Sequence, residues 1–113
     1  MDAARLGEFR EALLKLATEF RAEDEAAAGE RAPVELDQQS VGRLSRMDAL
    51  QVQAMAQETS RRRAAELRRI AAALARMEEG EYGYCVECGE EIAVRRLELD
   101  PATPLCINCA SGR

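Results

Sequence analysis

The sequence predicts a mainly α-helical protein in which a long antiparallel two-helix coiled-coil hairpin over residues 1–79 precedes a small four-cysteine module over residues 80–113. Three observations lead to this fold class. Large apolar residues recur at helical spacing in two stretches, an irregular segment containing Pro33 and Gly42 separates these stretches, and all four cysteines lie near the end of the chain. A chain of 113 residues fits one small domain, which buries little apolar surface and benefits from an added constraint.

The first helix is expected over about residues 5–30. Its large apolar residues are spaced alternately three and four positions apart, which is the rhythm of a helix that packs against a partner helix. They are Leu6, Phe9, Leu13, Leu16 and Phe20. Gly29 is a plausible stop signal, and Pro33 biases the residue before it away from helical dihedrals. We therefore place the connection, or tip, at about residues 31–44.

The second helix is expected over about residues 45–79, because this stretch contains neither proline nor glycine and is followed by Gly80. Large apolar residues recur only in its second half, at Leu67, Ile70, Leu74 and Met77. Earlier positions on the same face are smaller, namely Ala49, Val52, Ala56 and Ser60. The hairpin should therefore have its bulkiest packing beside the cysteines and thinner contacts toward the tip.

The net charge of −5 is unevenly distributed, with −5 over residues 22–40, +3 over residues 41–79 and −3 over residues 80–113. No segment is basic enough to bind DNA by charge alone, since that binding depends on neutralising several phosphates. The chain starts without the apolar core of a signal peptide, and no stretch approaches the roughly 18 apolar residues of a membrane span. We expect a soluble, cytoplasmic monomer with no membrane partner and no direct sequence-specific DNA binding.

The four cysteines form two Cys-x-x-Cys pairs, Cys85 with Cys88 and Cys106 with Cys109, and seventeen residues separate the pairs. Reducing compartments disfavour disulfides, so this spacing points to a metal before it points to cross-links. Zinc favours four thiolates in a tetrahedron, and each pair supplies two neighbouring corners. The sequence therefore predicts a zinc finger that holds one structural zinc ion.

Two other uses of the cysteines fit less well. A thiol–disulfide enzyme needs a reactive pair beside a βαβ pattern, and none is present. A catalytic zinc needs an open coordination position, normally with histidine or carboxylate ligands, and the chain has no histidine. A closed structural site in a non-enzymatic protein is the expectation. Gly89 is expected to turn backbone amides toward the sulfurs. Arg95 and Arg96 are candidates to moderate the thiolate charge, and the equal alternative for both is a solvated position.

Further residues surround the cysteines in a recognisable arrangement. They are Gly83-Tyr84-Cys85, Cys88-Gly89, Ile92, Arg95-Arg96-Leu97-Glu98, Pro101 and Leu105-Cys106-Ile107-Asn108-Cys109. Together with the long hairpin that precedes them, these residues resemble the DksA/TraR family of bacterial transcription regulators. The resemblance implies direct binding to the RNA polymerase core, with the hairpin entering the secondary channel and its tip approaching the active site.

The tip departs from the family pattern. Members of the DksA type carry Asp-x-x-Asp-x-Ala there, whereas the matching stretch of this chain, residues 42–47, reads Gly-Arg-Leu-Ser-Arg-Met. Neither aspartate is present. The candidate tip contacts to a partner are therefore Asp37, Ser45 and Asp48.

Basic residues form the second set of candidate contacts. The resemblance implies that they meet the rim of the polymerase channel, and the candidates are Arg62, Arg69, Arg95 and Arg96. The alternative for the arginines of the second helix is a solvated face paired with glutamates of the first helix. Two of the basic residues with which DksA and polymerase hold guanosine tetraphosphate appear here as Asp100 and Ala110, although Arg69 keeps a basic group. We therefore predict a weak or absent response to that nucleotide.

Two other functions stay open from the sequence. One is a zinc-ribbon adaptor whose helical hairpin binds another protein. The other is direct nucleic-acid binding through the arginines and the ribbon, which would show as salt-sensitive DNA binding without polymerase.

Overall fold

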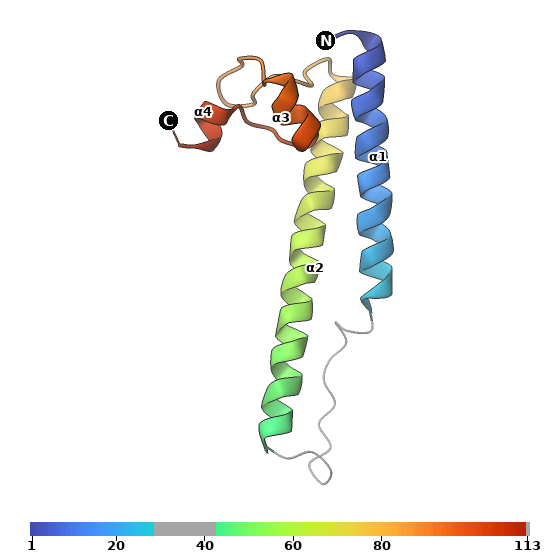
Figure 1. The fold of residues 1–113 in the computed structure, drawn as a ribbon, viewed down its shortest axis with the longest axis vertical. Coiled ribbons are helices and arrows are strands. Elements are labelled where there is room, and N and C mark those ends of the chain that lie inside the picture. Colours follow the sequence, from blue (N-terminus) through green and yellow to red (C-terminus); the bar gives the residue numbers. More distant parts are fainter. Residues whose placement is uncertain (29–42, 113) are drawn as a thin grey trace.

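The structure is a computed structural model that describes residues 1–28 and 43–112. It contains four helices over these ranges, which are α1 (Ala3–Ala26), α2 (Arg43–Glu78), α3 (Val94–Leu99) and α4 (Ile107–Ala110). Helices α1 and α2 lie side by side in opposite directions and form a rod, and the segment that carries α3 and α4 projects from the end of this rod where the chain begins (Figure 1). We call residues 80–112 the finger. The predicted fold class is confirmed, since two long helices pack together and the cysteines form a C-terminal cluster.

Helix α1 begins at Ala3 because Asp2 caps it. The Asp2 Oδ1 atom accepts a hydrogen bond of 2.8 Å from the backbone N–H of Arg5. The helix thus starts two residues before the expected position. Its last turn carries three carboxylates, at residues 23–25, and no basic residue. Negative charge opposes the helix dipole at this end, which favours termination at Ala26. The expected stop at Gly29 lies outside the described residues.

Helix α2 ends in a glycine-dependent C-cap. Gly80 has a φ of 75°, its N–H donates to the Met77 carbonyl at 3.2 Å, and the Glu81 N–H donates to the Arg76 carbonyl at 2.8 Å. This pair of bonds is the Schellman motif, in which glycine accepts a left-handed conformation at little cost. With 36 residues against 24 in α1, α2 extends beyond α1 at the end of the rod far from the finger (Figure 1). No helix that the structure describes has the length and hydropathy to cross a membrane.

The buried core is concentrated at the finger end of the rod. Its members are Phe9, Leu13 and Ala17 of α1, Ile70 and Ala73 of α2, and Tyr82, Cys85, Ile92, Leu97 and Ala102 of the finger. Along the distal half of α2, by contrast, Met47, Leu50, Val52 and Met55 are exposed. The finger therefore completes the core of the rod and is not a separate appendage.

Tyr82 joins the finger to the rod. Its ring packs against Phe9 of α1 with the centroids 5.8 Å apart and the planes at 50°. Its hydroxyl donates a 2.8 Å hydrogen bond to the carbonyl of Pro101. One side chain thus links α1, the start of the finger and the segment after α3.

Because of this burial, we expect stability to fall at alkaline pH. Desolvation raises the pKa of Tyr82 to about 12, against 10 for the free side chain. Between these values the folded protein keeps a proton that the unfolded chain releases, so the contribution of Tyr82 to the free energy of unfolding is constant below pH 10 and decreases as pH rises toward 12. Urea unfolding across this range measures the slope.

Two phenylalanine variants separate this effect from general alkaline damage. Tyr82→Phe should unfold more easily at neutral pH, by about 1 kcal/mol for the lost hydrogen bond, but with a flatter pH dependence. Tyr84→Phe is the control, because Tyr84 is 41% exposed, and it should keep the slope of the parent protein. An unchanged slope in Tyr82→Phe would contradict the assignment.

Candidate metal centre

The structure brings the four predicted ligands together. All four sulfur atoms lie within 4.8 Å of one another, and the Sγ atoms of Cys88 and Cys106 are 3.7 Å apart. Tetrahedral zinc with Zn–S bonds of about 2.3 Å requires sulfurs roughly 3.8 Å apart. A disulfide bond would be about 2.05 Å long, and all four thiols are free. The cluster therefore fits one structural zinc ion of a C4 finger, as predicted.

The first cysteine pair lies on a tight loop closed by an antiparallel bridge between Tyr84 and Glu91. Within this loop the Cys85 N–H donates to the Glu90 carbonyl at 2.8 Å, and the Gly89 N–H donates to the Cys85 carbonyl at 2.9 Å. Gly89 has a φ of 76°, which favours glycine. Its own amide closes the turn through an oxygen, and backbone amides face the sulfurs as expected, that of Cys88 toward Cys85 and that of Glu90 toward Cys88.

The second pair lies at the start of α4. Cys106 is the N-cap of this helix, and its Sγ accepts the backbone N–H of Cys109 at 3.5 Å. The two ligands are therefore held in place by one helical turn. One turn of helix brings two residues at Cys-x-x-Cys spacing close together, so their sulfurs can occupy two neighbouring coordination positions of one metal ion.

The electrostatics of the thiols favour a cation at the cluster. Backbone N–H groups of Cys106 and Cys88 hold the pKa of Cys85 down to about 6, so this thiol ionises readily. The neighbouring thiols, Cys106 foremost, raise the pKa of Cys109 above its ordinary value. Four thiols this close together cannot all ionise unless positive charge compensates them. A divalent metal ion bound between them would supply that positive charge.

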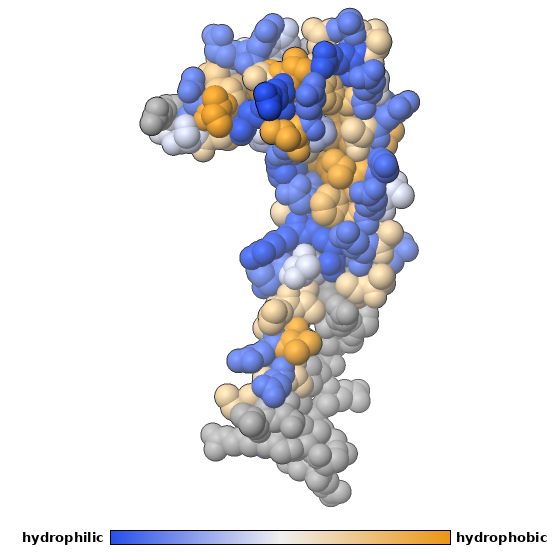
Figure 2. All heavy atoms as spheres, viewed as in Figure 1, coloured by the Kyte–Doolittle hydropathy of each residue, from blue (hydrophilic) through white to orange (hydrophobic). Residues whose placement is uncertain are grey.

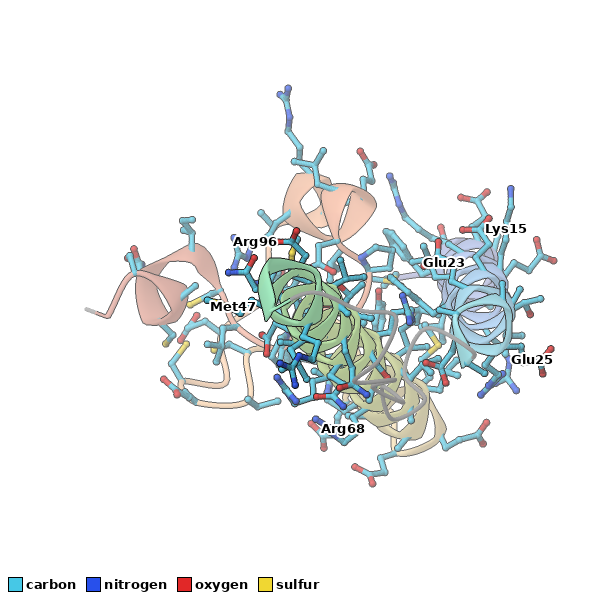
Figure 3. All side chains as sticks on the ribbon, turned by 90° about the horizontal axis from the view of Figure 1, so that it is seen from below. Lys15, Glu23, Glu25, Met47, Arg68 and Arg96 are labelled. Atoms are coloured by element: carbon cyan, nitrogen blue, oxygen red, sulfur yellow. The ribbon has the colours of Figure 1, made fainter. Side chains whose placement is uncertain are left out.

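Arg96 has a structural position within the finger. Its Nε donates to the Leu105 carbonyl at 2.9 Å and its Nη2 lies 3.4 Å from the Thr103 hydroxyl, so it ties α3 to the chain just before the second cysteine pair. Figure 3 shows Arg96 on the side of α2 that carries the finger. Its neighbour Arg95 is exposed and makes no hydrogen bond or ion pair with the residues that the structure describes.

Ion pairs connect the finger to both helices of the rod. Arg69 of α2 lies 2.6 Å from the Asp100 carboxylate and 2.7 Å from Glu66, while Arg5 of α1 lies 2.7 Å from Glu98 of α3. Burial alone would lower the pKa of Arg69, but the bonds to Asp100 and Glu66 raise it on balance. Of the candidate rim residues, Arg69 is thus already engaged by a carboxylate.

The remaining arginines of α2 differ in their surroundings. Arg62 has a side chain that is 78% exposed and a long contact of 3.4 Å to Glu58, which also pairs with Arg61. Arg63 is buried and approaches Asp24 of α1 at 3.4 Å, and its Nη2 atom has no hydrogen-bond partner among the described residues. Pairing with α1 therefore occurs through Arg63, while Arg61 and Arg62 pair within α2.

The candidate tip residues lie far along the chain from the cysteines. Asp37 lies outside the described residues. Ser45 is in the first turn of α2, and Asp48 follows it on the same helix with an exposed side chain. These residues remain candidates for contact with a partner.

Comparison with known proteins matches both parts of the molecule. Residues 80–113 match the prokaryotic DksA/TraR C4-type zinc finger. The whole fold superposes on the structure of transcription factor DksA2 from Pseudomonas aeruginosa with a TM-score of 0.80 and 30% identity, covering 98% of this chain and 84% of that one. The chain belongs to the DksA/TraR family.

Relatives that carry the name DksA match this chain over a shorter segment than the DksA2 structure does. The RNA polymerase-binding transcription factor DksA of Haemophilus influenzae is 46% identical over 43 residues, which are 38% of this chain and 30% of that protein. The protein of the same name from Escherichia coli is 44% identical over 43 residues, or 28% of its length. The matched segment thus spans less than a third of these relatives.

Proposed function

We propose that this protein regulates transcription, without catalysis, by binding the RNA polymerase core directly, with its rod inserted in the secondary channel and without sequence-specific contact to DNA. The observation that carries the proposal is the agreement with DksA2 over 98% of the chain, which includes both the rod and the finger. The relatives of similar sequence are named as RNA polymerase-binding factors. We also propose that the protein is cytoplasmic, as its polymerase partner is, and that it acts as a monomer.

The shape of the rod supports insertion into a channel. The molecule measures 64 × 31 × 20 Å, and α2 continues past the end of α1 into the distal half that carries exposed apolar side chains (Figure 1). Four of these side chains, Met47, Leu50, Val52 and Met55, are each between 47 and 70% exposed. Such surface is available to a partner that surrounds the helix.

Charge favours a protein partner over DNA. The last turn of α1 presents Glu23, Asp24 and Glu25, and Figure 3 shows Glu25 on the side of α1 away from α2. The net charge of −5 adds to the repulsion of phosphates. Carboxylates on a slender rod suit basic channel walls or a bound magnesium ion instead.

The direct test is capture of polymerase followed by crosslink mapping. A tagged, zinc-loaded protein should retain core polymerase from a bacterial lysate. A photo-crosslinking residue at Met55 should then label the secondary channel of the purified core enzyme, while one at Leu14 of α1 should label it less. Failure to retain core polymerase would favour the adaptor function, and crosslinks outside the channel would reject the insertion.

Charge reversal tests the rim contacts. Arg62→Glu and Arg95→Glu should weaken polymerase binding, since neither guanidinium is held by a close internal contact. Lys15→Glu on α1 is the matched control and should bind as the parent does. DNA binding in the absence of polymerase, if sensitive to salt, would support the nucleic-acid alternative.

We also expect guanosine tetraphosphate to have little or no effect through this protein. Asp100 already neutralises Arg69 at 2.6 Å, and a carboxylate at that place repels a phosphate. In vitro transcription from a ribosomal promoter should therefore give the same result with and without the nucleotide, provided the protein itself has an effect. A marked nucleotide response of the parent protein would contradict this prediction.

Asp100→Ala should change the free energy of unfolding by at most about 1 kcal/mol, because the pair of Arg69 and Asp100 is partly exposed.

A further inference from the structure

The buried core of the rod ends at a charged residue. Ala17 is the last buried residue of α1, and Phe20 and Leu67 still pack against the core as partly buried side chains. Arg63 comes next on α2 and is only 9% exposed. On the face shown in Figure 2, hydrophobic side chains gather over the finger and the adjoining rod, and hydrophilic side chains follow further along the rod. Apolar packing thus gives way to a buried guanidinium where α1 approaches its end.

The guanidinium of Arg63 is incompletely paired. Its Nε atom lies 3.4 Å from the Asp24 carboxylate, whereas Arg69 lies 2.6 Å from Asp100. Its Nη2 atom is the one buried side-chain nitrogen or oxygen without a hydrogen-bond partner in the part of the chain that the structure describes. Removing a charge from water is costly unless close hydrogen bonds and an opposite charge replace that water. Closing the rod at this layer therefore costs free energy that the Asp24 contact offsets only in part.

The facing end of α1 is also weakly held. Of residues 21–26, all but Asp24 are exposed, so few apolar contacts hold this segment to α2. Its last turn carries three carboxylates and no basic residue, and that charge opposes the helix dipole. Local opening is favoured where few buried apolar contacts are lost and buried charges regain water. Residues 21–26 meet both conditions.

We propose that the layer formed by Arg63 and Asp24 is a built-in opening point of the rod. Residues 21–26 separate from α2 as one unit, while the earlier turns of α1 stay packed against α2 and the finger. Opening exposes Arg63 to water and restores the hydration that burial removed. The far end of the rod can thus change the spacing of its two helices without loosening the finger. The inference does not depend on the proposed function, because it concerns the protein by itself.

Amide hydrogen exchange of the zinc-loaded protein tests the opening directly. In the parent protein, amides of residues 21–26 should exchange at least about tenfold faster than those of residues 9–17, after correction for intrinsic rates. They should share one protection factor and respond little to low concentrations of urea, because a local opening exposes little surface. Amides of residues 9–17 should instead lose protection as urea rises, because they exchange when the whole rod unfolds.

Substitutions at two arginines of α2 assign the opening to burial of Arg63. Arg63→Met removes the buried charge and keeps an unbranched side chain of similar helix propensity, while the Asp24 side chain, 39% exposed, stays hydrated. Exchange of residues 21–26 should slow by at least about fivefold, since an apolar side chain stabilises the closed form. Arg63→Leu should act in the same direction. Arg68→Met is the matched control, because Arg68 is exposed, and it should leave these rates as in the parent.

Three results would overturn the proposal. One is that residues 21–26 exchange with the same protection and urea dependence as residues 9–17, since the rod then opens only as a whole. Another is protection that falls steadily from residue 21 to residue 26 and is unchanged in both Arg63 variants, which describes simple fraying of the helix end. The third is equal slowing by Arg63→Met and Arg68→Met, which would attribute the effect to net charge and not to burial.

Discussion

Removing zinc is expected to unfold the finger while α1 and α2 stay largely helical. The finger has one antiparallel bridge and two helices of 6 and 4 residues, so little besides the metal holds its loops. Structural zinc supplies about 10–16 kcal/mol of apparent binding free energy, comparable to the whole stability of a small domain. Far-UV circular dichroism should change little on chelation, because α1 and α2 contain 24 and 36 residues. Amide signals of residues 80–112 should lose their dispersion.

A cysteine substitution gives the same result without chelator. Cys109→Ser should abolish stoichiometric zinc binding and unfold the finger, whereas Val86→Ser, an exposed position between two ligands, should leave both intact. The thermal midpoint of the rod should fall in the cysteine variant, since Tyr82 and Leu97 no longer cover its core. Purified protein with no stoichiometric metal, or with its thiols oxidised in pairs, would contradict the zinc assignment.

The metal site was predictable because its information is local. Each Cys-x-x-Cys pair needs only one turn of chain to place two sulfurs, and the spacing between the pairs is typical of zinc ribbons. The two long helices were predictable for a similar reason, since their apolar spacing and the signal at Gly80 lie within each element. The ends of the two helices were harder to predict, because Asp2, which caps α1, is not part of the apolar pattern.

The seating of the finger on the rod was not predictable from the sequence. It depends on pairs far apart along the chain, such as Arg5 with Glu98 and Phe9 with Tyr82. No periodicity signals which distant residues meet. The same limit applies to Arg96, whose hydrogen bond to the Leu105 carbonyl has no signal in the sequence. Arg96 remains a candidate for partner contact.

The second large effect is expected at Leu97, whose side chain is completely buried between the finger and the rod. Leu97→Ala should lower the free energy of unfolding by about 2–5 kcal/mol, because it removes buried apolar atoms and leaves a cavity that a small core cannot easily close. That loss is a large fraction of the stability of a small domain. Urea unfolding of the zinc-loaded protein measures it.

Leu99→Ala provides a control on the same short helix. The two positions share α3 and the same substitution, so they share any change in helix propensity, but Leu99 is 84% exposed and should change stability by at most about 0.5 kcal/mol. The difference between the two variants therefore isolates burial at the joint. Since zinc ligation holds the finger loops independently of Leu97, the Leu97→Ala protein should retain its metal while the finger loosens on the rod. Equal destabilisation by both substitutions, or loss of zinc in Leu97→Ala alone, would show that the metal site and the joint are not separate sources of stability.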